Sequence, residues 1–305
     1  MDTLRVLSLN IWNRSGPWEA RLPLIRAGLA AEAAHLVGLQ EVMCIDGPLG
    51  RISQLDELAP PDDAAARYPH RVYAPAWTID SGNGFTMGNA LLSQVPIVDS
   101  QQALLPNPMG HETRSLLFAL CQTPHGLLPV AVTHLDWQLH LSHVRCQQVS
   151  FIVDKLEEWL APHRQAGADL LPVILMGDFN AEPGSDEIRF LRGYHALPSA
   201  TSGQLRGTYF NDALQFVGGD TGPTFARDNV FAVREREPDR RLDYIFVQLA
   251  DRFGRGLPLT GRRCFLNAQD GVHPSDHYGV LTDLQISRPP AAASPPSAHP
   301  EKSSK

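Results

Sequence analysis

The chain has 305 residues, of which 43% are hydrophobic and 19% are charged, so disorder over most of its length is excluded. Its 26 Lys and Arg residues against 33 Asp and Glu residues give a formal net charge of −7. This balance argues against a broad, positively charged surface for binding nucleic acid. No stretch approaches the ~18 apolar residues of a membrane span, and the first residues lack the pattern of a signal peptide. We therefore expect a soluble, cytoplasmic protein.

Short apolar runs alternate with turns along the chain, and most have the length and composition of buried strands. The expected strands are 4–10, 37–42, 88–93, 116–121, 128–134, 172–177, 243–247 and 278–286. Two segments have helical composition, 21–35 and 142–160, and the second carries an apolar stripe at helical spacing. Many strands with few helices predict an α+β protein in which packed sheets carry helices on the outside.

The composition changes in two places. From Ser287 onward Pro, Ala and Ser dominate, which predicts a disordered tail over 287–305 behind a domain over 1–286. Gly, Asp, Pro and Arg dominate in 195–241, a pattern typical of a long surface loop. The four cysteines lie far apart without a Cys-x-x-Cys pair, so we expect reduced thiols rather than disulfides or a zinc site.

Several expected strands end in a polar residue that a hydrophobic core would not select. These residues are Asn10, Glu41, His134 and Asp178. Strand ends can converge at one edge of a layered sandwich, where such side chains would meet. The pattern therefore indicates a functional site at that edge.

The segment Gly177–Asn180 follows directly after the apolar run 173–176. Asp178 and Asn180 are two residues apart, so in an extended segment they point the same way. The carboxylate can then take a proton from a water molecule while the amide orients that water. The alternative is an Asx turn that only ends the strand.

Four further residues carry possible chemistry, and the first three also have a plain structural alternative. His277 follows Asp276 and can act as an acid, a base or a phosphate ligand, or lie in a surface turn. Glu41 ends a buried run, where it needs a hard cation such as Mg²⁺ or an arginine partner. Asn10 can bond a ligating carboxylate or cap a turn, and Asp243 can hold a histidine in one tautomer.

Taken in order, these motifs resemble the endonuclease/exonuclease/phosphatase superfamily, which includes deoxyribonucleases, abasic-site endonucleases, neutral sphingomyelinases and inositol-polyphosphate 5-phosphatases. The resemblance spans about residues 4–286. It implies a four-layered α/β sandwich of two packed, mostly antiparallel sheets, and hydrolysis of a phosphate ester with Mg²⁺ or Mn²⁺. The matching segments are LSLN (7–10), LQEV (39–42), GNALLS (88–93), ETRSLL (112–117), VTHL (132–135), GDFN (177–180), RLDYIFV (241–247) and PSDHYGV (274–280).

The resemblance also implies which residues bind the metal and activate water. Glu41 resembles the principal metal ligand of the superfamily, with Asn10 beside it and Asp276 as a second ligand. Asp178 resembles the residue that positions or deprotonates the attacking water. Asn180 resembles the residue that orients this water and stabilises charge on the phosphoryl group.

A second group of residues is implied to contact the phosphate. His277 resembles the histidine that contacts the phosphoryl group, and Asp243 resembles the carboxylate that orients it. His134 resembles the second histidine of the deoxyribonuclease-like members. Arg114 falls where some members place a phosphate-binding arginine.

The substrate is less defined by the sequence than the chemistry. Because the chain is acidic and has no lysine before residue 155, a small or lipid-linked phosphate ester is favoured over nucleic acid. Aromatic residues near the motifs, including Trp12, Trp18 and Trp137, can stack on a base or headgroup or pack on the core. The alternatives are a metal-dependent DNA or RNA nuclease and a binding module without activity. We expect a monomer.

Overall fold

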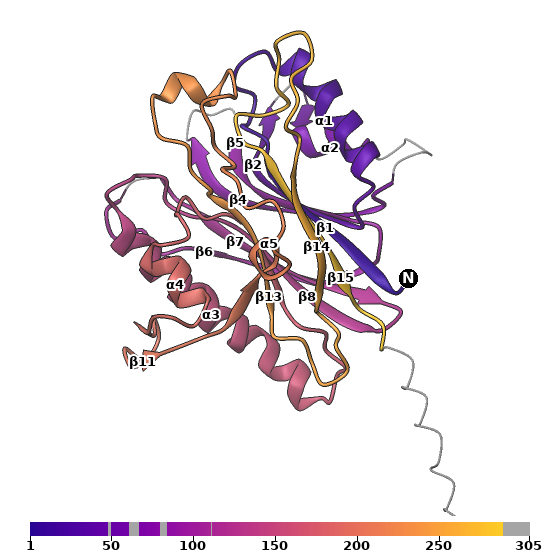
Figure 1. The fold of residues 1–305 in the computed structure, drawn as a ribbon, viewed down its shortest axis with the longest axis vertical. Coiled ribbons are helices and arrows are strands. Elements are labelled where there is room, and N and C mark those ends of the chain that lie inside the picture. Colours follow the sequence, from indigo (N-terminus) through magenta and orange to yellow (C-terminus); the bar gives the residue numbers. More distant parts are fainter. Residues whose placement is uncertain (48–49, 61–66, 80–83, 111, 289–305) are drawn as a thin grey trace, which may run out of the picture.

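The computed structural model describes residues 1–47, 50–60, 67–79, 84–110 and 112–288, and two β-sheets form its centre (Figure 1). The first sheet has the strand order β14-β15-β1-β2-β5-β4, with β3 paired to β2. Only β1 and β2 are parallel in it. Its strands are β1 (Thr3–Asn10), β2 (Leu36–Gly47), β3 (Gly50–Ser53), β4 (His70–Ile79), β5 (Phe85–Ser93), β14 (Pro258–Cys264) and β15 (Gly279–Gln285).

The second sheet has the order β12-β13-β9-β8-β7-β6, and only β8 and β9 are parallel. A parallel pair needs a crossover, which the long helix α3 (Ser142–Gln165) supplies. The strands are β6 (Ile97–Leu104), β7 (Ser115–Thr123), β8 (Gly126–His134), β9 (Ile174–Asp178), β12 (Phe210–Asp212) and β13 (Asp243–Gln248). The two-residue strands β10 (Leu197–Pro198) and β11 (Leu205–Arg206) pair separately.

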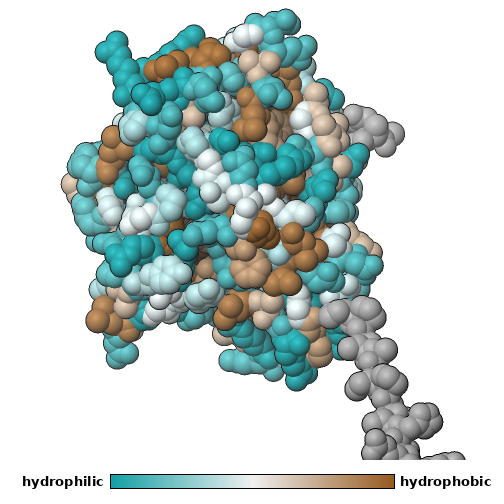
Figure 2. Space-filling view, in the orientation of Figure 1, coloured by the Kyte–Doolittle hydropathy of each residue, from teal (hydrophilic) through white to brown (hydrophobic). Residues whose placement is uncertain are grey.

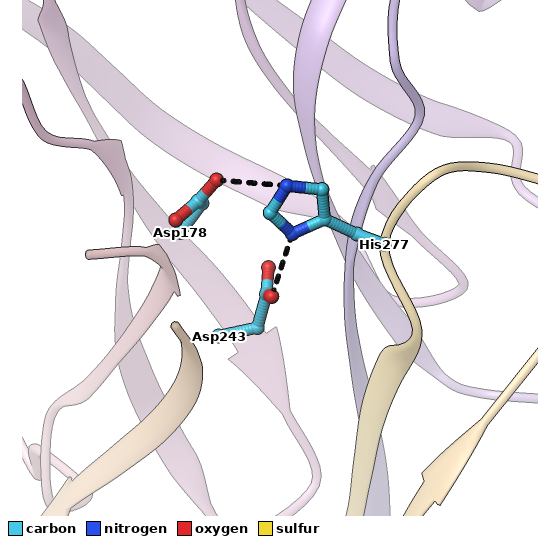
Figure 3. A group of neighbouring side chains, drawn as sticks. All are labelled: Asp178, Asp243 and His277. Atoms are coloured by element: carbon cyan, nitrogen blue, oxygen red, sulfur yellow. Dashed lines mark hydrogen bonds and ion pairs between the residues drawn. The ribbon is translucent and has the colours of Figure 1, made fainter. Parts of the chain in front are cut away.

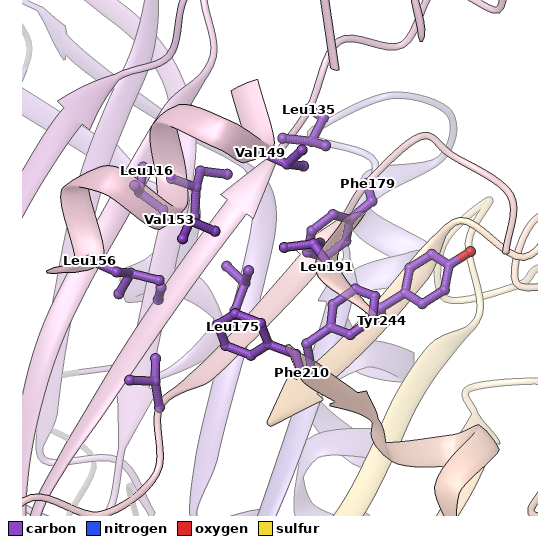
Figure 4. Close-up of a cluster of buried hydrophobic side chains, with 14 of the residues drawn as sticks. Leu116, Leu135, Val149, Val153, Leu156, Leu175, Phe179, Leu191, Phe210 and Tyr244 are labelled. Carbon is purple, nitrogen blue, oxygen red and sulfur yellow. The ribbon is translucent and has the colours of Figure 1, made fainter. Parts of the chain in front are cut away.

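Three apolar clusters hold four layers together. Between the sheets, Val6 and Leu91 of the first sheet pack with Val130 and Ile245 of the second. Helices α1 (Trp18–Glu32) and α2 (Gln54–Leu58) cover the outer face of the first sheet. On the other side, α3 and α4 (Asp186–Leu191) pack on the second sheet through residues such as Val149 (Figure 4). The expected sandwich of two mostly antiparallel sheets with outer helices is confirmed.

The expected strands all occur, with ends shifted by a few residues, and the two expected helices begin at Trp18 and Ser142. Strands β3, β4, β6 and β14 were not expected from the sequence. The expected loop over 195–241 also contains β10, β11, β12, α5 (Ala213–Phe216) and a 3₁₀ turn (Ala232–Glu235). The expected tail lies outside the described residues from position 289 onward.

All four cysteines are free; Cys44, Cys121 and Cys264 are buried and Cys146 is half-buried. Figure 2 shows a mainly hydrophilic face on which apolar residues lie in small separate groups. Within the described ranges, no helix has both the length and the apolar composition that crossing a membrane requires.

Candidate active site

Three polar residues form a row across the second sheet. His134 at the end of β8 pairs in register with Asp178 at the end of β9, and Asp178 pairs with Asp243 at the start of β13. Register partners on neighbouring strands project from the same face, so the three side chains lie side by side. All three are buried, with exposed fractions of 5%, 1% and 0%.

The first sheet contributes Asn10 and Glu41 opposite this row. The side-chain amide of Asn10 donates to Glu41 Oε1 and to Asp178 Oδ2, both at 3.1 Å, so it connects the two sheets. Glu41 has a φ of 60°, and the register of β2 with β5 shifts between Leu39 and Val42. Such a bulge turns a side chain out of the regular alternation, and here the carboxylate also accepts a 2.8 Å hydrogen bond from Asn13.

His277 lies between the two carboxylates of the row (Figure 3). Its Nδ1 is 2.8 Å from Asp243 Oδ2, and its Nε2 is 3.7 Å from Asp178 Oδ2. Burial works against the charged imidazole, but Asp243 and Asp178 raise the pKa of His277 well above its usual value. His277 is therefore protonated at neutral pH, with one N–H held by Asp243 and the other directed towards Asp178.

Asp178 receives contacts from several directions. Its Oδ1 accepts the backbone N–H of Asn180 at 2.9 Å, which is the Asx turn that the sequence left open as an alternative. Its Oδ2 is the atom that contacts Asn10 and faces both histidines. Burial, followed by the charge of Asp243, raises the pKa of Asp178 to about 6, although His277 opposes the shift.

His134 is neutral, in contrast to His277. Burial, then Arg114 and His277, lowers the pKa of His134 well below its usual value. Nη1 of Arg114 donates to His134 Nδ1 at 3.0 Å, because a guanidinium has only donor groups. His134 Nε2 lies 3.4 Å from Asp178 Oδ2 and 3.0 Å from Asn180 Nδ2.

These groups open into a cleft of about 290 Å³. Its lining includes Glu41, Arg114, His134, Asp178, Asn180, Asp276 and His277, while Asn10 and Asp243 contact these residues from beneath. The structure thus brings together every site residue that the sequence suggested.

Other lining residues were not identified from the sequence as part of the site. Glu112 lies 2.9 Å from Arg114, and Arg240, another lining residue, pairs with Glu237. The only signal for Glu237 and Arg240 was the charged run 234–241, which does not show whether its side chains point into the cleft or into solvent. Of the aromatic residues, Trp137 lines the cleft and is 53% exposed, whereas Trp18 is buried in the core around α1.

Several of these side chains can act as metal ligands. Asp178, Asp243 and His277 each offer one ligand atom, and these atoms lie within 4.8 Å of one another. Carboxylate oxygens of Glu41 and Asp276 border the same cleft. The arrangement therefore concentrates metal-ligating groups around one buried point, as a metal-dependent enzyme requires.

Comparison with known families identifies the chain. A family model described as Endonuclease/Exonuclease/phosphatase family matches residues 7–277. The chain belongs to this family. It is accordingly a metal-dependent phosphoesterase, and the resemblance inferred from the motifs is confirmed.

Solved structures share the fold. The endonuclease/exonuclease/phosphatase from Beutenbergia cavernae is 24% identical, with a TM-score of 0.64 over 94% of this chain and 72% of that one. The human Nocturnin catalytic domain is 20% identical, with a TM-score of 0.62 over 94% of each chain. Protein angel from Drosophila melanogaster is 36% identical over 73 residues. That match spans 24% of this chain and only 18% of the length of the curated relative.

Proposed function

We propose that this protein uses Mg²⁺ or Mn²⁺ to hydrolyse a small or lipid-linked phosphate ester by attack of an activated water. The observation that carries the proposal is that the row of His134, Asp178 and Asp243 meets Glu41 and His277 at one cleft. The row supplies the proposed base, Asp178, and the residues on either side of it. Glu41 supplies a metal ligand, and His277 supplies a cation. Hydrolysis of a phosphate ester needs each of these components.

The proposed metal ligands are Glu41 and Asp276, with Asn10 beside them. Glu41 accepts hydrogen bonds from the neutral amides of Asn10 and Asn13, and Asp276 Oδ1 lies 3.2 Å from the hydroxyl oxygen of Ser275. No ion pair to either carboxylate occurs within the part of the chain that the structure describes. Carboxylate oxygens without an ion-pair partner fit a hard divalent cation.

Asp243 and His277 fit a different role. Since each is bonded to the other at 2.8 Å, the ligand atoms they would offer are already engaged. We therefore assign this pair to substrate binding and orientation. A bound divalent ion supplies charge neutralisation to a phosphoryl oxygen.

Asp178 is the proposed base. Its side chain lines the cleft, and the Asn10 amide together with the Asn180 backbone fixes the orientation of the carboxylate. As the water oxygen bonds to phosphorus and the bond to the leaving oxygen breaks, the water proton passes to Asp178. The Asn180 amide orients that water.

His277, His134 and Arg114 are the proposed donors to the phosphoryl group. His277 is protonated and held by Asp243, and the buried guanidinium of Arg114 borders the same cleft. Donors fixed in a site with little water stabilise the charge that develops on phosphoryl oxygens. His277 and Arg114 do not need to move far, because each of these side chains is held by a carboxylate.

The cleft supports a small substrate. Its volume lies at the lower end of the range for small-molecule pockets. Carboxylates outnumber arginines in the lining, and Glu112 and Glu237 pair with the two arginines present. Such a surface disfavours a long polyanion. The exposed ring of Trp137 favours the second candidate, a nuclease, because nucleobases stack on such rings.

The test is a substrate panel with Mg²⁺ on the wild type and on Asp178→Asn. The panel contains bis-p-nitrophenyl phosphate, p-nitrophenyl phosphate, an inositol phosphate, sphingomyelin, supercoiled plasmid and single-stranded RNA. We expect metal-dependent turnover of a small or lipid-linked ester that is lost in Asp178→Asn. Cleavage of only plasmid or RNA would establish the nuclease instead, and equal activity of the two proteins would refute the role of Asp178.

A further inference from the structure

Arg21 on α1 is a charged side chain with no exposed surface. Buried arginines usually pair with a carboxylate, yet its guanidinium donates only to backbone carbonyls. The acceptors are the carbonyl oxygens of Ile11 (2.8 Å), Trp12 (3.1 Å), Asn13 (2.8 Å), Ser15 (3.1 Å) and Pro274 (2.9 Å). One side chain thus satisfies five carbonyl groups that no strand or helix uses.

These carbonyls belong to two segments that adjoin residues of the proposed metal site. Residues 11–15 follow directly after Asn10, and Pro274 comes two residues before Asp276. The segments also meet directly, since the hydroxyl of Ser275 donates to the carbonyl of Asn10 at 2.7 Å. Arg21 therefore joins both segments from beneath the site.

The first of these segments needs support. Trp12 and Asn13 have positive φ angles of 54° and 36°, a region that residues other than glycine rarely adopt without external contacts. Arg21 binds the carbonyl of each. Asn13 in turn donates its side-chain amide to Glu41 Oε2 at 2.8 Å, so a short chain of contacts leads from Arg21 to the principal proposed ligand.

Two tryptophan rings enclose the guanidinium. Its central carbon lies 4.9 Å from the ring centre of Trp12 and 5.3 Å from that of Trp18. A planar guanidinium can stack on such faces and still donate in its own plane, which an ammonium cannot reproduce. Burial lowers the pKa of Arg21 to about 10, with Asp276 and Glu41 opposing the shift. The group remains charged at neutral pH.

We propose that Arg21 is a positioning residue of the metal site, holding segments 11–15 and 274–277 in the arrangement that directs Glu41 and Asp276 towards one ion. The inference rests on the proposed metal site. It does not require Arg21 to touch the metal or the substrate.

Charge and positioning predict opposite effects when Arg21 is removed. A buried cation close to Glu41 and Asp276 repels Mg²⁺, so its charge alone would make binding tighter in Arg21→Met. Loss of positioning would make binding weaker in the same variant. Arg21→Lys separates the two contributions, because it keeps the charge but has three donors in place of five.

The experiment measures Mg²⁺ affinity by isothermal titration calorimetry on the full chain. Wild type, Arg21→Lys and Arg21→Met are compared with Arg255→Lys. Arg255 is a matched control since it is also buried and bonds the carbonyl of His125, but its other partners are Asp169 and Asp251, away from the cleft. Circular dichroism establishes that each variant is folded.

We expect the dissociation constant of Mg²⁺ to rise roughly tenfold or more in both Arg21 variants, the size seen when partners of metal ligands are removed. Arg255→Lys should bind as the wild type does. Unchanged or tighter binding in folded Arg21 variants would overturn the inference. A wild type that binds no Mg²⁺ would instead overturn the proposed metal site.

A milder variant covers the case in which the Arg21 variants do not fold. Trp12→Leu removes one ring from the guanidinium at a half-buried position, while all five carbonyl acceptors remain. We expect a smaller rise in the Mg²⁺ dissociation constant. Binding identical to that of the wild type would count against the positioning role.

Discussion

Asp178 and Asp243 are register partners on β9 and β13, so two buried carboxylates lie side by side under the cleft. Such a pair is costly in a site of low dielectric unless a cation compensates it. His277 supplies the cation, with one ring nitrogen towards each carboxylate (Figure 3). The charge of His277 and the ionisation of Asp178 are therefore coupled.

The Asp243→Asn substitution tests this coupling. An amide holds the His277 ring but contributes no charge, so the pKa of His277 falls and the donor to the phosphoryl group is lost. We expect kcat to fall roughly 10²-fold or more, as for a group supporting acid–base catalysis. The measurement is kcat on the ester that the panel identifies.

Asp283→Asn is the matched control for this substitution. Asp283 on β15 also bonds a cation, Arg5, at 2.8 Å, but it is not part of the cleft lining. We expect a wild-type kcat for this variant. A full kcat in Asp243→Asn would contradict the coupling.

Gly177 sets the spacing between β8 and β9. A Cβ atom at this position would lie 1.9 Å from the carbonyl oxygen of Thr133, so Gly177→Ala forces the two strands apart beside Asp178. We expect a loss of roughly 1–3 kcal/mol or more in the free energy of unfolding together with reduced turnover. Urea denaturation and kcat measure the two effects.

Gly184→Ala provides the comparison for Gly177→Ala. A Cβ atom there meets nothing within 4 Å. Stability and turnover should therefore stay close to those of the wild type. Equal stability of the two alanine variants would show that the strand spacing adapts.

The sequence predicted the residues of the site more completely than it predicted the edge strands of the two sheets. Asn10, His134 and Asp178 are recognisable because each is polar and follows an apolar run. Strands β6 and β14 have no such signal: as edge strands they are exposed along much of their length, so no apolar run marks them. The contacts of the Arg21 side chain could not be predicted either. Its proposed role depends on backbone carbonyls of two segments, around Ile11 and Pro274, that are far apart in the sequence.

His35 makes the stability depend on pH. Its Nδ1 accepts the backbone N–H of Arg5 at 2.8 Å, a bond that a protonated Nδ1 cannot accept. Burial, followed by the charge of Arg5, lowers the pKa of His35 from 6.5. Because the folded pKa is the lower one, this contribution is present above pH 6.5 and is lost as the pH falls through the folded value.

The expected result is a free energy of unfolding that decreases from pH 7.5 to pH 5. His35→Asn keeps an acceptor near the position of Nδ1 but does not titrate, so its decrease should be smaller. Urea denaturation across this pH range gives both curves. Parallel curves would assign the acid sensitivity to other groups.

Arg114 provides the last prediction. Its Nη1 and Nη2 are held by His134 and Glu112, while its Nε is buried without a partner. Because these contacts already hold the guanidinium at the cleft, it can donate to the phosphoryl group with little further loss of side-chain conformational entropy. Arg114→Met removes this donor, and we expect kcat/KM to fall roughly 10²-fold, the effect of losing one donor to a developing anion.

The structural effect of Arg114→Met is separable from this loss. Arg206→Met removes an arginine that pairs with Asp154 and Glu157 far along α3 from the cleft, so it lowers the melting temperature without lowering kcat/KM. Arg114→Lys keeps a cation but not the planar fork, and its kcat/KM should lie between those of the wild type and Arg114→Met. If Arg114→Met lost only thermal stability, Arg114 would support the wall of the cleft through Glu112 and would not bind the phosphate.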